Sequence, residues 1–181
     1  MGNQEKPKRL EHKTLYESEW LNLHRDQVLL PAGRLLEQYH IIEMKKDSIA
    51  SIVVNKEEEI LLVKTPRYPT DSIEWEAPAG FLENENEIFD GAYREILEET
   101  GLGTKNHKLI YKYYPVNGIS DSLTYVICCE VTDEVKKFDR NKTIEIKWFA
   151  IEELKEMIAK NLIMSGPTLI ALLHFMSPDF T

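Results

Sequence analysis

The chain has 181 residues, of which 43% are hydrophobic and 29% charged, and this composition suits one globular domain with a sizeable core. Its net charge of −9 argues against nonspecific binding to nucleic acid or to an anionic membrane. No apolar run approaches the ~20 residues of a membrane span, and the polar start lacks the apolar core of a signal peptide, so we expect a cytoplasmic protein.

The order of predicted elements indicates an α/β fold. Alternating or short apolar runs predict strands at residues 13–29, 35–45, 51–54, 60–64, 75–78, 107–116, 122–131 and 143–150. Helical spacing predicts helices at 87–100, 151–161 and 168–176. Prolines in 65–72 and charges in 132–142 favour loops there. Strands, a central helix, strands and C-terminal helices together suit a mixed sheet between helices.

The central helix carries the clearest periodic signal. Ile88, Ala92 and Ile96 recur at i, i+4 and i+8, which places them on one stripe of a helix. Gly101 follows directly, at the position where a helix-ending glycine adopts the left-handed conformation. The sequence therefore predicts that the helix ends at residue 100 and packs its apolar stripe against the core.

Three carboxylates share another face of the same helix. Glu95, Glu98 and Glu99 are spaced i, i+3 and i+4. At roughly 6 Å, each pair costs about 0.7 kcal/mol in water and about 3 kcal/mol at an effective dielectric constant near 20. A solvated helix tolerates that repulsion, and an acidic exposed face is one interpretation. In a cleft the cost calls for a cation, and glutamate oxygens are hard ligands suited to Mg²⁺ or Mn²⁺.

Residues 79–102 resemble the Nudix box, whose pattern is G-x5-E-x7-R-E-U-x-E-E-x-G-U with U an aliphatic residue. The positions in register are Gly80, Arg94, Glu95, Ile96, Glu98, Glu99, Gly101 and Leu102. One position departs, because Asn86 stands where the pattern has its first glutamate. The resemblance implies a Nudix α/β/α sandwich with a mixed sheet, preceded here by an N-terminal antiparallel strand pair.

The chain is further similar to the ADP-ribose pyrophosphatase branch of this family, which hydrolyses nucleoside diphosphate sugars. Residues 64–80 correspond to a stretch of that branch in which Arg67 matches an arginine near the diphosphate and Glu76 a carboxylate near the metals. The base-stacking aromatics of the branch fall on Trp20 and Tyr39. Periodicity alone favours the interpretation of both residues as ordinary sheet aromatics.

The resemblance implies a chemistry for these residues. Metal ions, Mg²⁺ or Mn²⁺, held by Glu95, Glu98, Glu99 and the Ala79 carbonyl would neutralise the diphosphate and acidify a bound water. Arg67 would add a bidentate phosphate contact. Arg94, in the family pattern, orients the loop of the box more than it touches substrate.

Two departures from the family pattern concern catalysis. With Asn86 in place of glutamate, Arg94 keeps at most a neutral hydrogen bond at that position. The loop glutamate that serves as catalytic base should precede residues 143–146, where Lys142 takes its place. Asp139 and Glu145 are the possible replacements.

The resulting prediction divides the chain into a polar tail (1–11), an N-terminal strand pair (12–46) that serves dimerisation and the substrate pocket, and a Nudix hydrolase domain (47–181). The predicted enzyme is a homodimer that cleaves a nucleoside diphosphate sugar into a nucleoside monophosphate and a sugar phosphate. The alternative is a Nudix module that binds such a ligand as a sensor. The acidic balance disfavours a hydrolase acting on RNA, so no nucleic acid or membrane partner is expected.

Overall fold

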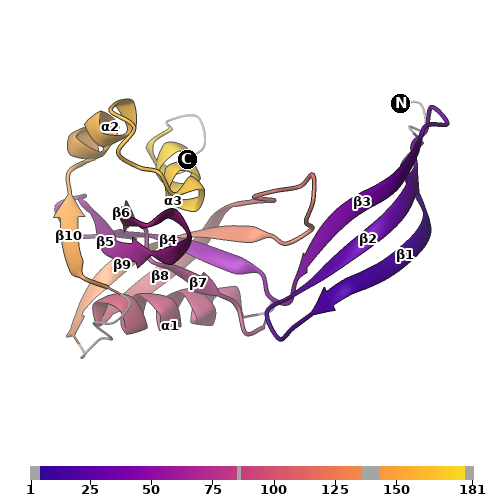
Figure 1. The fold of residues 1–181 in the computed structure, drawn as a ribbon. Helices are drawn as coiled ribbons and strands as arrows, with labels where there is room; N and C mark the ends of the chain where they lie inside the picture. The colour runs from indigo at the N-terminus through magenta and orange to yellow at the C-terminus, as the bar shows by residue number, and fades with distance from the viewer. Residues whose placement is uncertain (1–4, 85–86, 136–142, 178–181) are drawn as a thin grey trace. The chain divides into compact units, whose positions relative to one another are not determined.

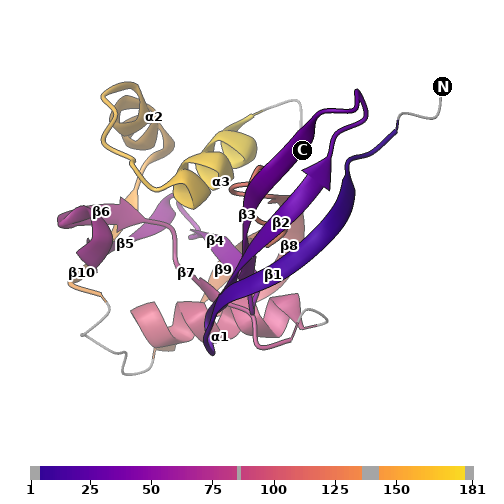
Figure 2. The same ribbon diagram turned by 45° about the vertical axis from the view of Figure 1, so that its right-hand side comes forward.

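The computed structural model describes residues 5–84, 87–135 and 143–177, and the chain divides into two compact units, each with a sheet of its own (Figures 1 and 2). The N-terminal unit comprises Met1–Lys46 with Val116–Ser122, and the core unit comprises Asp47–Pro115 with Leu123–Thr181. Within the described ranges, no helix is long and apolar enough to cross a membrane.

The core unit is built on a seven-stranded mixed sheet. Its strands lie in the order β10-β5-β4-β9-β8, while β6 pairs with β5 and β7 pairs with β4. Strands β4 and β9 are parallel, and the other paired strands are antiparallel. The strands are β4 Ser48–Val54, β5 Ile60–Arg67, β6 Ser72–Glu76, β7 Ala79–Phe81, β8 Leu102–Tyr113, β9 Thr124–Val135 and β10 Glu145–Phe149.

Helices cover both faces of this sheet. Helix α1 (Ile88–Thr100) lies on one face, and α2 (Ile151–Ala159) and α3 (Gly166–Met176) lie on the other (Figures 1 and 2). The α/β/α sandwich predicted from the sequence is therefore confirmed. A short 3₁₀ helix, Tyr68–Thr70, joins β5 to β6.

Alternation along β4 supplies both halves of the core. Ile49 packs with Ala92 of α1, whereas Ile52 packs with Leu154 of α2 and Leu172 of α3. All five side chains are at most 1% exposed, and full burial of an aliphatic side chain contributes about 1.5–3 kcal/mol. The sheet is thus buried on both faces, which explains why its central strands read as continuous apolar runs.

Helix α1 follows its sequence pattern closely. Ala92 and Ile96 of the predicted stripe are fully buried. Gly101 ends the helix with φ 74°, in the left-handed region, and its N–H binds the carbonyl of Leu97. The prediction of the helix, its buried stripe and its terminating glycine is confirmed.

The N-terminal unit contains a three-stranded antiparallel sheet, where the sequence predicted two strand-like runs. The run 13–29 divides at Ser18, whose Oγ accepts from the N–H of Trp20 (3.2 Å) and of Leu21 (3.1 Å) and so forms the turn. The first strand begins inside the segment expected to be a polar tail. Because every residue of that strand is exposed, its sequence carries no alternation to reveal it. The strands are β1 Lys8–Glu17, β2 Leu21–Leu29 and β3 Leu35–Met44.

A second difference concerns residues 65–72, which were expected to form a loop. Strand β5 continues to Arg67, and β6 begins at Ser72, so the two strands pair over residues 63–67 and 72–76. Pro66 pairs with Ile73 inside this hairpin. Proline is tolerated in an outer pairing of this kind, because only one ladder hydrogen bond is lost.

Candidate active site of the core unit

Gly80 of β7 lies directly against a carboxylate of α1. A methyl group on Gly80 would come within 2.1 Å of the carboxyl carbon of Glu95. Glu95 itself is only 6% exposed. The glycine of the box is therefore needed for space, because any side chain there would expel the carboxylate from its position on β7.

A second carboxylate of α1 reaches the same strand. Glu99 is 9% exposed, and its Oε2 accepts a hydrogen bond of 3.3 Å from the backbone N–H of Ala79. Glu95 and Glu99 thus lie at the neighbouring residues Gly80 and Ala79. Two of the three predicted carboxylates are buried, which excludes the interpretation of a solvated acidic face for them.

Arg94 connects the third carboxylate to the box loop. Its Nη1 lies 2.8 Å from Glu95 and 3.6 Å from Glu98, whose side chain is 43% exposed. Its Nη2 donates to the carbonyl of Phe81 at 2.9 Å, where the chain leaves β7. Arg94 therefore holds the last residue of β7, directly before the loop, to the helix.

The donor set fits a hard divalent cation. Glu95, Glu98 and Glu99 place three negative charges on one helix, and Arg94 neutralises them only in part. Carboxylate oxygens are the ligands that Mg²⁺ and Mn²⁺ take. Among the described residues, no group of three or more acidic, histidine or cysteine side chains is already arranged as a metal cluster.

Arg67 and Glu76 form a two-pronged ion pair. The Nε of Arg67 donates to Glu76 Oε1 at 2.8 Å, and Nη2 donates to Oε2. Hydrogen bonding to Glu76, which is 5% exposed, raises the pKa of Arg67. Both residues line a cavity of about 330 Å³ together with Ala79. Three of the residues predicted from the resemblance therefore meet at one cavity.

The other residues that line this cavity were not predicted from the sequence. They are Thr70, Glu74, Met164, Ser165 and Pro167. The alternation of β6 places Glu74 on the same face as Glu76, and this signal was available in the sequence. The turn between α2 and α3, in contrast, is separated from β6 by about ninety residues of chain. A hydrogen bond from Ala77 N, just after β6, to Thr168 Oγ1 at the start of α3 (3.0 Å) joins the two segments.

Glu145 lies in a different groove. It pairs with Lys64 across β10 and β5 at 3.3 Å, and both residues line a cavity of about 570 Å³. That cavity does not include Arg67 or Ala79 among its lining residues. The other residues that bear on the base, Asp139 and Lys142, and the departing box residue Asn86 lie outside the described residues.

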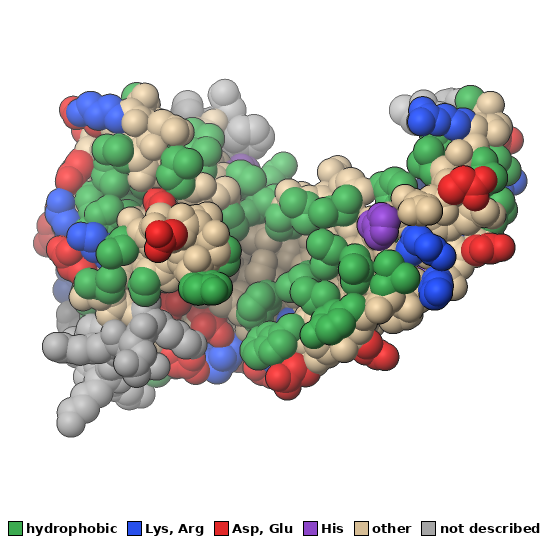
Figure 3. Space-filling view, viewed as in Figure 1, with side chains coloured by type: hydrophobic (Ala, Val, Ile, Leu, Met, Phe, Trp, Pro, Cys, Tyr) green, Lys and Arg blue, Asp and Glu red, His purple; other side chains and the backbone are tan. Residues whose placement is uncertain are grey.

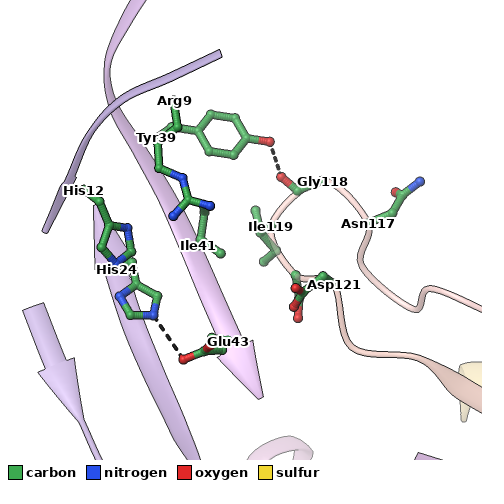
Figure 4. Close-up of a pocket in the computed structure, with 11 residues that line it drawn as sticks. Arg9, His12, His24, Tyr39, Ile41, Glu43, Asn117, Gly118, Ile119 and Asp121 are labelled. Atoms are coloured by element: carbon green, nitrogen blue, oxygen red, sulfur yellow. Dashed lines mark hydrogen bonds and ion pairs between the residues drawn. The ribbon is translucent and has the colours of Figure 1, made fainter. Parts of the chain in front are cut away.

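The two predicted stacking aromatics lie at separate places in the N-terminal unit. Trp20 is 59% exposed beside the turn between β1 and β2. Tyr39 lies in β3 and donates its hydroxyl hydrogen to the carbonyl of Gly118 (Figure 4). Because Leu21 pairs with Met44, the span of β3 between Tyr39 and the Trp20 turn is about 17 Å. The two residues are therefore not neighbours in the sheet.

Tyr39 borders a polar cavity of about 360 Å³ (Figure 4). His12 and His24 lie in it with ring centroids 4.5 Å apart. His12 Nδ1 donates to Asp26 at 2.7 Å, and His24 Nε2 lies 3.3 Å from Glu43. Hydrogen bonding to His24 lowers the pKa of Glu43. The N-terminal unit thus holds a polar network beside the predicted base-stacking residue, and His24 and Asp26 are its buried members.

Sequence profiles place both units in described families. The profile of the NUDIX domain matches residues 44–166, more than half of the chain. The profile of the nucleoside diphosphate sugar hydrolase N-terminal domain matches residues 8–42.

Individual proteins agree with these profiles. The chain is 27% identical over 173 residues to ADP-ribose pyrophosphatase of Bacillus subtilis (strain 168), and the match covers 91% of this chain and 92% of that protein. It is 26% identical to CMP-5'-(N-acetyl-N-hydroxy-3-aminopropyl)phosphonate hydrolase of Streptomyces rubellomurinus (strain ATCC 31215), covering 89% and 78%. A crystal structure of ADP compounds hydrolase has the same fold, with a TM-score of 0.84 at 14% identity over 97% and 95% of the two chains. With its box geometry intact at β7 and α1, the chain belongs to the Nudix family of hydrolases.

Proposed function

We propose that this Nudix hydrolase cleaves the diphosphate bond of a nucleoside diphosphate sugar such as ADP-ribose, giving a nucleoside monophosphate and a sugar phosphate. The observation that carries the proposal is the meeting of two sets of residues at Ala79. The N–H of Ala79 donates to Glu99 of the box, and Ala79 also lines the cavity that contains Arg67 and Glu76. A carboxylate cluster and an arginine at one strand suit a substrate that brings dense negative charge.

Glu95, Glu98, Glu99 and the Ala79 carbonyl are the proposed metal ligands. A bound Mg²⁺ or Mn²⁺ supplies neutralisation of the diphosphate and a lowered pKa of coordinated water. The role of Gly80 is to leave room for Glu95, and the role of Arg94 is to fix the loop at Phe81. Retention of all three carboxylates, two of them buried, supports hydrolysis, because a sensor does not need them.

Arg67 is the proposed diphosphate contact. Glu76 occupies its Nε and Nη2, which fixes the plane of the guanidinium and leaves Nη1 to donate to a phosphate oxygen. Glu76 thereby acts as a positioning residue for Arg67. Glu76 is nearly completely buried, whereas the Arg67 side chain is 47% exposed and can reach a ligand.

The base that activates water is proposed to be a carboxylate at or near β10. Glu145 starts that strand, although Lys64 holds it in the neighbouring groove. A comparison of Glu145→Gln with Asp139→Asn decides between the two acids, and the variant that loses about 100-fold or more in rate identifies the base. If Lys142→Glu accelerates turnover instead, the native chain works without a loop carboxylate.

Trp20 and Tyr39 are proposed to stack on the nucleobase, and the protein is proposed to act as a homodimer in the cytoplasm. We propose that each base lies between one ring from each protomer, because the two residues are separated by a backbone span of about 17 Å along β3 from Tyr39 to Met44, which pairs with Leu21. The two free cysteines, Cys128 and Cys129, are consistent with a reducing compartment. Light scattering at micromolar concentration tests the dimer, and a fully active monomer would exclude it.

A substrate screen tests the proposed function. Nucleoside diphosphate sugars, dinucleoside polyphosphates and nucleoside triphosphates are incubated with the protein and either Mg²⁺ or Mn²⁺. Released phosphomonoesters are measured after treatment with a phosphatase. We expect the highest kcat/KM for a nucleoside diphosphate sugar, and a preference for triphosphates would contradict the proposal.

A further inference from the structure

The cavity that Arg67 and Glu76 share with Ala79 continues between β6 and the turn that joins α2 to α3. Thr70 and Glu74 form one wall, and Met164, Ser165 and Pro167 form the other. Hydrophobic side chains are present on the face of the core unit that Figure 3 shows, and in this unit Ile73 and Met164 are 58% and 61% exposed. A site for part of the substrate beyond the diphosphate is therefore framed by both elements.

Glu74 is the unusual charge in this cavity. It is half-buried, on the same face of β6 as Glu76, and among the described residues it has no hydrogen-bond or ion-pair partner. Glu76, two residues on, is bound by Arg67. Glu74 and Met164 also line the neighbouring groove, where Lys64 pairs with Glu145 and Lys147 pairs with Glu153. A half-buried carboxylate without a partner is an acceptor for donors that a ligand brings.

The opposite wall offers a hydroxyl donor with a defined direction. Ala77 N donates to Thr168 Oγ1 at 3.0 Å, so the Thr168 hydroxyl donates onward to Ser165 Oγ, also at 3.0 Å. Ser165 Oγ also accepts from the N–H of Thr168 at 3.5 Å. Ser165 accepts in both contacts, so its own hydroxyl hydrogen is available to a ligand in the cavity that it lines.

The lining chemistry selects a sugar over a base. None of the described residues that line the cavity is aromatic, whereas nucleobases are held by stacking. An acceptor at Glu74 and a donor at Ser165 match sugar hydroxyls, which donate and accept. Met164 and Pro167 supply an apolar surface for ring carbons. A volume of about 330 Å³ is at the lower end for ligand pockets and suits half of a nucleotide sugar.

We propose that this cavity binds the sugar phosphate half of the substrate, with Glu74 accepting hydrogen bonds from the sugar hydroxyls and Ser165 donating to one of them. This inference rests on the function proposed above, and it names the residues that set the specificity of the enzyme for the sugar. Met164, whose sulfur accepts from Asn161 Nδ2 at 3.5 Å, limits the size of the sugar.

Binding of D-ribose 5-phosphate and of inorganic phosphate to the full chain tests the proposal without turnover. Isothermal titration calorimetry is done on wild type, Glu74→Gln and Glu74→Ala, with Glu57→Ala, an exposed turn residue, as the matched control. We expect Glu74→Ala to weaken ribose 5-phosphate binding about tenfold, because the acceptor is lost. Glu74→Gln should weaken it by less, because the amide oxygen still accepts from hydroxyls, although more weakly than a carboxylate. Inorganic phosphate should bind equally well or more tightly, since a negative charge near Arg67 has been removed.

The outcomes separate this inference from the proposed function. If ADP-ribose is hydrolysed while Glu74→Ala leaves the affinity for ribose 5-phosphate unchanged, or weakens both ligands equally, the inference is overturned and the proposed function stands. If wild type does not bind ribose 5-phosphate at millimolar concentration, the inference also falls. If no nucleotide sugar is hydrolysed at all, the proposed function fails, and the inference fails with it.

A second experiment concerns the size of the sugar that the cavity accepts. Met164→Ala should raise the ratio of kcat/KM for ADP-glucose to that for ADP-ribose by about threefold or more, because a hexose gains room that a pentose does not need. An unchanged ratio would remove Met164 from the account of specificity.

Discussion

The N-terminal unit and the core unit bury opposite kinds of side chain. Strand β2 buries Asn22, His24 and Asp26, whereas Leu21 and Leu23, which alternate with them along the strand, are only half-buried. Strand β4 buries aliphatic residues on both faces. The core unit therefore gains its stability from apolar burial, and the N-terminal sheet depends on satisfied hydrogen bonds and on whatever covers its leucines. Substitutions in the core unit should therefore change turnover and stability, whereas substitutions in the N-terminal unit should change substrate binding and pH-dependent amide exchange.

The largest expected effect is in the core unit, at a residue whose loss leaves the apolar core untouched. Glu99→Gln keeps the volume and the hydrogen bond to Ala79 N but removes a charge from the proposed metal site. We expect turnover at limiting Mg²⁺ to fall at least about 100-fold, with an unchanged circular dichroism spectrum. Glu156→Gln, on the exposed face of α2, is the control. A wild-type rate for Glu99→Gln would remove Glu99 from the site.

Gly80→Ala should damage both stability and turnover. The new methyl group would lie 2.1 Å from the Glu95 carboxyl carbon, so the carboxylate or the strand must move. We expect turnover to fall about tenfold or more, because the Glu95 carboxylate must leave its position. The loss of stability should be smaller than the about 1–3 kcal/mol of a rigid overpacked site, because the atoms that must move are the end of a flexible side chain. Gly166→Ala, where nothing lies within 4 Å of the added atom, is the control, and equal turnover of the two variants would contradict the close approach.

In the N-terminal unit, we expect substitutions of the aromatics to act on substrate binding. Trp20→Ala and Tyr39→Ala should each cost about 1–3 kcal/mol, seen as a raised KM for ADP-ribose. Mixing the two variants sharpens the comparison. If each base is sandwiched between two protomers, mixed dimers regain one complete site and a low-KM phase appears. If both rings belonged to one chain, no mixed dimer would contain a complete site.

A smaller effect is expected from the polar network of the N-terminal sheet, and it depends on pH. Hydrogen bonding to His24 lowers the pKa of Glu43 below its usual value of 4.5. A lowered pKa in the folded state stabilises the fold above pH 4.5, and that contribution is lost as the pH falls through the folded-state value. Glu43→Gln should therefore increase amide exchange in β2 at pH 7 relative to wild type, with the difference shrinking below pH 4.5. Glu57→Gln is the control, and a difference that grows in acid would contradict the network.

The smallest expected effect concerns a thiol in the core unit. Burial raises the pKa of Cys129 to about 12, so at pH 8 only about one thiol in ten thousand is the reactive thiolate. We expect no modification of Cys129 by a thiol reagent in the native protein and rapid modification in denaturant. Rapid native modification, located by mass spectrometry, would show that β9 opens and that the apolar core is less well packed than described.

The two units also differ in how far the sequence predicted them. Helix α1 was predictable to its last residue, because Ala92, Ile96 and Gly101 act locally through helical period and backbone conformation. Strand β1 was not, since none of its residues is buried and its polar sequence has no alternation. The carboxylates of the box and Arg67 were found by resemblance. Glu74 was missed although the alternation of β6 places it on the face of Glu76, and Ser165 was missed because it lines the cavity through contacts between segments about ninety residues apart, which no local pattern encodes.

The most direct test of the proposed chemistry is ³¹P NMR of ADP-ribose incubated with the protein and Mg²⁺. Hydrolysis between the two phosphorus atoms predicts that both diphosphate signals disappear together and that AMP and ribose 5-phosphate appear in equal amounts. Glu99→Gln should leave the diphosphate signals in place. Persistence of the diphosphate with the wild-type protein, or its conversion to ADP and free ribose, would contradict the account.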